Sequence, residues 1–134
     1  MLSSTPQIMY IVPVMFEKPV KYIRYTICYG SLPDTTPHEE KTITRIYPDG
    51  LIEIREYEGK KVTSLIRKKV SKEKVKKLIN DIPNPKGEYN LFCGGARYTA
   101  IVFEDRSVSR DLMTPSCLDD FVMNLNSTPV MSLM

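Results

Sequence analysis

The chain of 134 residues has no tryptophan, a single histidine (His38) and only three cysteines. A single histidine excludes chemistry that needs two imidazoles within one chain. None of the paired cysteine spacings typical of zinc sites is present. No segment approaches the ~20 apolar residues that span a bilayer. We therefore expect no metal, no other cofactor and no membrane association.

The cysteines also bear on the compartment. Cys28, Cys93 and Cys117 are widely separated and odd in number, which fits free thiols in a reducing environment. A secretory signal is not expected, because residues 1–7 include no basic side chain and Pro13 interrupts the apolar run that follows. The sequence therefore predicts a small cytoplasmic protein with three free thiols.

A tight turn is the clearest local signal in the chain. Pro48 presets φ for one turn position, and Gly50 can adopt the positive φ that such a turn needs. A three-residue loop at this point predicts a hairpin with one apolar face and one charged face, as in an antiparallel sheet with one buried side. The predicted opposed pairs are Ile46 with Ile52, Thr44 with Ile54, and Arg45 with Glu53.

A second turn and a helix follow the hairpin. The turn around Gly59 returns the chain along residues 62–70, in a register that the sequence leaves open. Ser71 is a good N-cap, and Glu73 lies in the first turn, where the helix dipole favours negative charge. Pro83 ends the helix. Its apolar stripe consists of Val75, Leu78, Ile79 and Ile82.

A similar unit of two strands and a helix is predicted near the C-terminus. The strands cover residues 97–103 and 107–112, joined by a short charged turn. Thr114 is predicted to cap the helix, and Pro115 suits its first position. The apolar stripe of this helix consists of Leu118, Phe121, Val122 and Leu125.

Two more strands are predicted upstream, over residues 8–16 and 20–29; the first is an edge strand, because Pro13 cannot donate to a ladder. The whole pattern predicts an α+β fold, with an antiparallel meander of about six or seven strands and two helices packed on one face. The element order is β-β-β-β-β-α-β-β-α. We expect a single domain over residues 1–126 and a frayed C-terminal tail over residues 127–134.

Positive charge is concentrated in one part of the chain. Residues 1–77 carry 15 basic and 9 acidic side chains, whereas residues 78–134 carry 4 and 7. One interpretation is a polyanion-binding surface, with a helix N-terminus that favours phosphate. The other is a solvated helix face, since the helical lysines lie opposite the apolar stripe. The polyanion interpretation assigns binding to Arg67, Lys68, Lys69, Lys72 and Lys76.

A reactive thiol is a further candidate. Cys93 precedes Gly94 and Gly95, and a thiol beside glycines could act as a nucleophile in an open backbone pocket. The alternative is a bulge or bend that leads into the next strand, with the thiol packed beneath it. A cysteine-dependent enzyme using Cys93 is the least favoured of three functional hypotheses.

Tyrosines supply the last candidate surface. Several of the eight fall in or beside predicted strands, and because strand faces alternate they cannot all be buried on one side. They include Tyr22, Tyr25, Tyr29, Tyr47 and Tyr57. Tyrosines facing away from the helices could bind protein or single-stranded nucleic acid. The alternative is a solvent-exposed sheet surface without a binding role, because amphipathic tyrosine tolerates contact with water. We assign a possible interaction face to Tyr22, Tyr47 and Tyr57.

The leading hypothesis is a non-enzymatic interaction module that binds a protein partner, or a second copy of itself, through the sheet face or the N-terminal edge strand. It is favoured because the sequence offers no catalytic constellation. The second hypothesis is a binder of nucleic acid or another polyanion through residues 67–77. No recognition-helix pair, zinc finger or aromatic ribonucleoprotein motif accompanies that segment.

Overall fold

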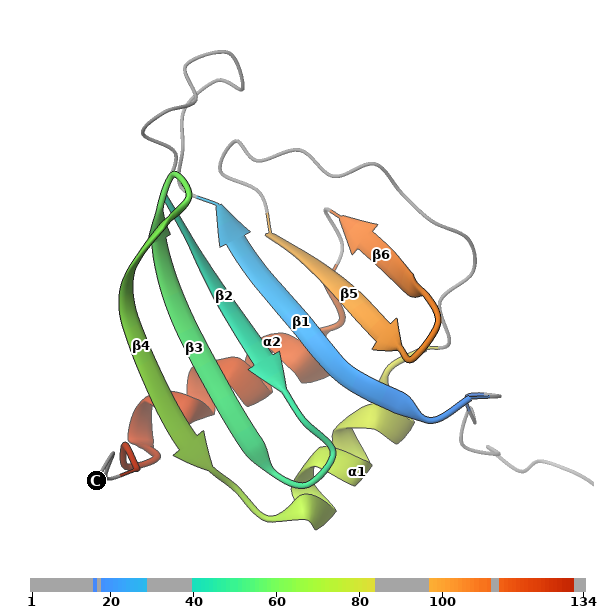
Figure 1. Ribbon diagram of the computed structural model, residues 1–134. Helices are drawn as coiled ribbons and strands as arrows, with labels where there is room; N and C mark the ends of the chain where they lie inside the picture. The colour runs from blue at the N-terminus through green and yellow to red at the C-terminus, as the bar shows by residue number, and fades with distance from the viewer. Residues whose placement is uncertain (1–15, 17, 29–39, 84–96, 112–113, 132–134) are drawn as a thin grey trace, which may run out of the picture.

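The computed structural model describes residues 16, 18–28, 40–83, 97–111 and 114–131. Within them the chain forms six strands and two α-helices (Figure 1). In chain order these are β1 (Val20–Cys28), β2 (Glu40–Ile46), β3 (Leu51–Glu58), β4 (Lys61–Lys69), α1 (Lys72–Asp81), β5 (Arg97–Phe103), β6 (Ser107–Asp111) and α2 (Ser116–Asn124), followed by a short 3₁₀ helix over Leu125–Ser127.

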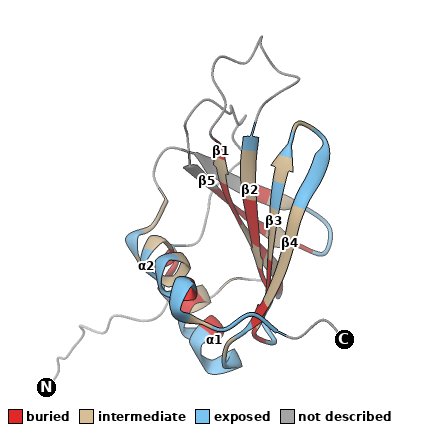
Figure 2. Cartoon of the chain, turned by 90° about the vertical axis from the view of Figure 1, so that its left-hand side faces the viewer, coloured by how far each residue is buried: buried red, intermediate tan, exposed pale blue. Residues whose placement is uncertain are grey.

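All six strands belong to one antiparallel sheet in the order β4-β3-β2-β1-β5-β6. Both helices lie against the same face of the sheet, and neither covers the opposite face (Figures 1 and 2). The predicted α+β architecture is therefore confirmed. The strand expected over residues 8–16 lies outside the described part of the chain, except for Phe16, which is not in a strand.

The register predicted for the first hairpin is confirmed. Ile46 lies opposite Ile52, Thr44 opposite Ile54, and Arg45 opposite Glu53. The backbone nitrogen of Tyr47 donates to the carbonyl of Leu51 at 2.9 Å, and Gly50 has a φ of 99°. The carbonyl of Gly50 also accepts a 2.9 Å hydrogen bond from Val70, so this turn holds the strand end just before α1.

A row of apolar side chains crosses the sheet on the helix side. The strand registers align Val108, Ile101, Ile23, Ile46 and Ile52, one from each of five neighbouring strands. All five are at most 3% exposed. Helix side chains cover the row, and burial is concentrated where the two layers meet (Figure 2). The covering residues that are themselves buried are Val75, Leu78, Ile82, Leu118 and Leu125.

Helix α1 begins as its sequence predicts. The hydroxyl of Ser71 accepts a hydrogen bond from the backbone nitrogen of Lys74 at 3.3 Å, and Glu73 lies in the first turn. The helix ends at Asp81, and the backbone of Ile82 is already extended ahead of Pro83. Local capping chemistry is sufficient to define this element.

The predicted start of α2 is wrong by one position. Pro115 has a ψ of 140° and occupies the N-cap, so the helix begins at Ser116. The hydroxyl of Thr114 lies 2.9 Å from both carboxylate oxygens of Asp119 and makes no capping bond to the backbone. The Thr114 hydroxyl therefore binds the carboxylate of Asp119, which also accepts a hydrogen bond from Tyr25 of the sheet.

The residues after α2 return to the edge of the sheet. Val130 forms an isolated antiparallel bridge with Lys68, and the backbone nitrogen of Met131 donates to the carbonyl of Arg67 at 2.8 Å. The Lys68 side chain is buried and donates to the carbonyl of Leu125. In the part of the chain that the structure describes, no helix is long and apolar enough to cross a bilayer.

Candidate functional site

The face of the sheet away from the helices carries a concentration of arginine and tyrosine side chains. Tyr25 points toward α2, because its hydroxyl donates to Asp119 at 2.8 Å. Strand alternation then directs Tyr22 and Arg24 to the opposite face. The same parity, carried across the ladders, defines what we call the arginine–tyrosine face. It includes Tyr22, Arg24, Arg45, Tyr47, Glu53, Arg55, Tyr57 and Arg67.

The three tyrosines assigned from the sequence to an interaction surface lie together on this face. The ring centroids of Tyr22 and Tyr47 are 5.3 Å apart, with a tilt of 44°. The guanidinium carbon of Arg45 lies 5.8 Å from the Tyr22 ring centroid, and Lys41 Nζ lies 5.4 Å from that of Tyr57. All three tyrosines are half-buried. Cations therefore already occupy positions over two of the rings.

Arg45 connects the tyrosines electrostatically. Burial alone would lower the pKa of Arg45, but hydrogen bonding and electrostatic attraction to Tyr22 and Tyr57 outweigh it and raise the pKa above its usual value. Burial likewise raises the pKa of Tyr57 on its own, yet Arg55 and Arg45 together lower that pKa below its usual value. The Tyr57 hydroxyl thus lies in a strongly positive environment.

Tyr47 shows the opposite balance. Burial and the nearby charge of Glu53 raise the pKa of the Tyr47 hydroxyl above its usual value, and the opposing effect of Arg45 is smaller. The two hydroxyls therefore lie in different electrostatic surroundings. Arginines dominate around Tyr57, whereas the charge of Glu53 also acts on Tyr47. Burial and Glu53 thus favour the neutral form of Tyr47, whereas Arg55 and Arg45 favour the ionised form of Tyr57.

Glu53 makes ion pairs that the sequence did not predict. Arg45 is its register partner, as expected, but the ion pairs of Glu53 within the described residues are with Arg55 Nη2 at 3.1 Å and Arg67 Nε at 3.5 Å. The Glu53 side chain is only 10% exposed. The carboxylate is thus shared by two arginines of β3 and β4, and Arg45 has no carboxylate partner in that part of the chain.

One row across the sheet shows the resulting charge imbalance. Arg24 lies directly opposite Arg45, Arg45 opposite Glu53, and Glu53 opposite Arg67. Like charges in directly opposed positions destabilise a sheet. The row contains three guanidinium groups and one carboxylate, so it is suited to an added negative charge.

The basic cluster of residues 67–77 does not form one surface. Arg67 lies on the arginine–tyrosine face and is bound to Glu53, whereas Lys68 is directed to the helix side and buried. Lys69 is exposed on β4. Lys72 and Lys76 are exposed on α1, where they line a pocket of about 360 Å³ together with Pro48, Glu73, Ile79 and Asn80.

The cysteines are only partly as expected. Cys28 is disulfide-bonded, so the prediction of three free thiols is wrong for it. Cys117 is a free, half-buried thiol. Burial, reinforced by the nearby charge of Asp81, raises its pKa above the usual value, which disfavours the reactive thiolate. Cys93 and His38 lie outside the described residues.

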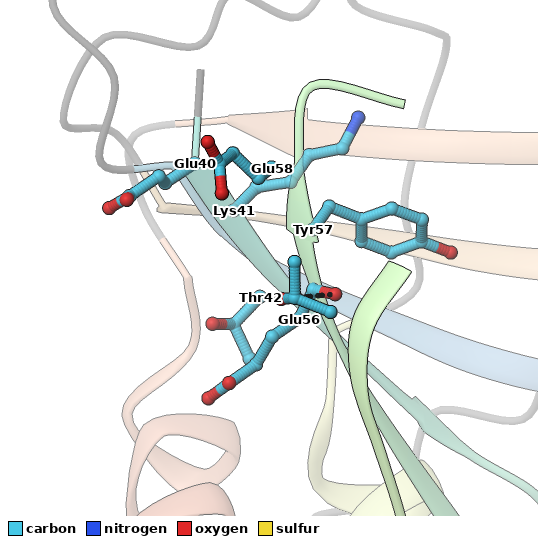
Figure 3. A pocket seen from close by; sticks show the side chains of 7 residues that line it. Glu40, Lys41, Thr42, Glu56, Tyr57 and Glu58 are labelled. Carbon is cyan, nitrogen blue, oxygen red and sulfur yellow. Dashed lines mark hydrogen bonds between the residues drawn. The ribbon is translucent and has the colours of Figure 1, made fainter. Parts of the chain in front are cut away.

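A pocket of about 340 Å³ lies at the hairpin end of β3 and β4 (Figure 3). Its lining side chains point to two sides of the strands: Lys41 and Tyr57 to one side, and Glu40 and Glu56 to the other. The hydroxyl of Thr63 donates to the carbonyl of Glu56 at 3.2 Å. Acid and base groups therefore do not converge in this pocket. No cluster of three or more potential metal ligands occurs among the described residues.

Sequence reasoning did not assign Arg24, Arg45 and Arg55 to a site. The available signal was strand parity, since Arg24 lies two residues from Tyr22 in a predicted strand and Arg55 lies two residues from Glu53 and Tyr57. Placing Arg24 beside Arg45 required the long-range pairing of β1 with β2.

No protein-family model, no curated protein and no solved structure matches this chain.

Proposed function

We propose that this protein is a non-enzymatic interaction module whose arginine–tyrosine face binds an acidic segment of a protein partner. The observation that carries the proposal is the grouping of Tyr22, Tyr47 and Tyr57 around Arg45 on a sheet face that neither helix covers. Tyrosine and arginine, together with tryptophan, are enriched at energetically important interface positions. Among the ion pairs of the described residues, Glu53 is the carboxylate that pairs with arginines of this face.

The arrangement of the rings favours a protein partner over single-stranded nucleic acid. Base stacking needs open aromatic faces. Here Lys41 lies over the Tyr57 ring, Arg45 lies over the Tyr22 ring, and Tyr47 packs beside Tyr22. Cations held over rings are positioned to meet carboxylates, and the tyrosines supply hydroxyls and apolar edges to the same contact.

The test is binding of a fluorescently labelled oligoglutamate peptide, measured by anisotropy at low salt. We expect saturable binding that weakens as salt rises, because the attraction between exposed charges is screened. Arg45→Gln should weaken binding several-fold. Lys76→Gln, which removes the same charge from the exposed surface of α1, is the matched control and should leave binding nearly unchanged.

Two results would overturn the proposal. The first is equal weakening by Arg45→Gln and Lys76→Gln, since binding would then follow net charge alone. The second is tighter binding of oligothymidylate than of oligoglutamate, with the same dependence on Arg45. That outcome would mean that the arginine–tyrosine face binds nucleic acid. The polyanion hypothesis would then hold for the sheet face and not for residues 67–77.

Location is part of the same proposal. The cytoplasmic placement expected from the sequence depended on free thiols, and the disulfide of Cys28 argues against it, because disulfides persist mainly in oxidising compartments. We therefore favour a partner met in an oxidising environment. Fractionation of cells that express the tagged chain tests this, and recovery only from the cytosol with Cys28 reduced would refute it.

A further inference from the structure

Unpaired polar atoms gather at one place on the arginine–tyrosine face. Four buried side-chain atoms have no hydrogen-bond partner within the described residues, and Thr99 Oγ1, on the helix side, is one of them. The other three are Arg45 Nη1, Arg55 Nε and Thr26 Oγ1. Most buried polar groups in proteins are hydrogen-bonded, so three unpaired donors on one face need an explanation.

The strand registers place the three residues that carry these atoms around a single residue, Ile43. Thr26 lies opposite Ile43 on β1, and Arg55 lies opposite Ile43 on β3. Arg45 lies two residues along β2, on the same face as Ile43. Ile43 is itself only 9% exposed, so a nearly buried apolar side chain lies at the centre of these three positions.

Positive charge also exceeds negative charge around Ile43. Arg55 uses Nη2 to hold Glu53, which leaves its Nε unpaired. Arg24, directly opposite Arg45, adds a further positive charge. A buried guanidinium donor without an acceptor is costly, and the cost is removed when an anion accepts its hydrogen bonds.

We propose that Arg45 and Arg55 form an oxyanion subsite over Ile43, which takes an aspartate or glutamate carboxylate from the partner. This inference rests on the proposed function and names the group of the partner that is recognised. Thr26 is fully buried and is not one of the contacting residues. The Arg45 and Arg55 side chains are only half-buried, and a shift of these side chains opens their unpaired nitrogen atoms to a carboxylate. Arg24 strengthens the subsite through its charge. A planar guanidinium matches a carboxylate through two parallel hydrogen bonds, which a lysine cannot reproduce.

The experiment follows the arginine side-chain N–H signals by NMR while sodium acetate replaces sodium chloride at constant ionic strength. We expect saturable shifts of the Arg45 and Arg55 signals and no shift for Arg106, whose guanidinium lies 4.5 Å from the Phe103 ring centroid at a distant turn. Arg45→Lys should weaken acetate binding about tenfold, the loss expected for one charge-assisted hydrogen bond. Arg106→Lys is the matched control.

The outcomes separate this inference from the proposed function. If the Arg45 and Arg55 signals do not move with acetate while oligoglutamate still binds, the proposed oxyanion subsite is refuted. The proposal that the arginine–tyrosine face binds an acidic segment is then retained. If the signals move with sodium phosphate and not with acetate, the subsite does not bind a carboxylate, and a phosphorylated group is the ligand instead. Equal effects of Arg45→Lys and Arg106→Lys also overturn the subsite. Circular dichroism of each variant confirms that it is folded.

Discussion

The hydroxyl of Tyr25, in the central strand β1, donates a 2.8 Å hydrogen bond to Asp119 in helix α2. Tyr25 is only 3% exposed, so this bond connects the middle of the sheet to a helix across the core. Tyr25→Phe should lower the free energy of unfolding by about 1 to 3 kcal/mol, because it removes a buried donor from a carboxylate. Urea denaturation of the variant measures the loss.

A double-mutant cycle of Tyr25→Phe with Asp119→Asn checks that the loss belongs to this contact. The two changes should be non-additive by about 0.5 kcal/mol or more, as expected for residues in direct contact. Strict additivity would show that Tyr25 stabilises the core through packing alone.

The turn at Gly50 provides a second prediction. A Cβ added at this position would lie 2.1 Å from the carbonyl oxygen of Val70, which no small adjustment relieves. Gly50→Asn should therefore destabilise the fold by about 2 kcal/mol or more, since main chain must move to make room. Gly59→Asn is the control, because Gly59 also has a positive φ, 62°, and asparagine tolerates that region. Similar thermal shifts for the two variants would contradict the steric explanation.

Lys68 and Lys69 allow a comparison of adjacent lysines. Lys68 is 8% exposed and its ammonium group donates to the carbonyl of Leu125, whereas Lys69 is exposed. Lys68→Ala should cost about 1 to 3 kcal/mol, because a buried carbonyl loses its charged donor. Lys69→Ala should change stability by less than about 0.5 kcal/mol. Chemical denaturation of both variants decides, and a neutral Lys68→Ala would mean that the buried ammonium is not structural.

Thiol reactivity gives a fourth prediction. Because burial and Asp81 raise the pKa of Cys117, its thiolate fraction at neutral pH is lower than that of an unperturbed thiol. Iodoacetamide should label it more slowly than N-acetylcysteine, and the rate should keep rising above the pH at which the small thiol levels off. Mass spectrometry should find Cys28 unlabelled until a reductant is added. Rapid labelling of Cys117 at neutral pH would contradict its burial.

Local signals predicted much of the fold. The turn through Pro48 and Gly50 was enough to predict that Arg45 lies opposite Glu53, and Ser71 was enough to predict the start of α1. The start of α2 was missed because Thr114 bonds to Asp119, which also accepts from a residue of β1. Such tertiary competition for a capping side chain is not visible in local sequence.

The site was less predictable than the fold. The three tyrosines were named from strand alternation alone, but the arginines beside them depend on two registers that local sequence does not specify. One is the pairing of Arg24 with Arg45 between β1 and β2. The other is the pairing of β3 with β4, which contains a register shift between Glu56 and Tyr57. Ion pairs of Glu53 therefore formed with Arg55 and Arg67 instead of Arg45.

The position of β1 also has a consequence for how the sheet assembles. β1 to β4 pair in chain order, and β5 pairs with β6, whereas Ile23 of β1 must also meet Ile101 of β5 across most of the chain. The loop-closure entropy of the sheet is therefore concentrated at the β1–β5 junction, which joins a four-stranded meander, β1 to β4, to the β5–β6 hairpin. We expect the amides of β6 to exchange with solvent faster than those of β3, as two cooperative units of unequal stability would show; uniform exchange would mean that the sheet opens as one unit.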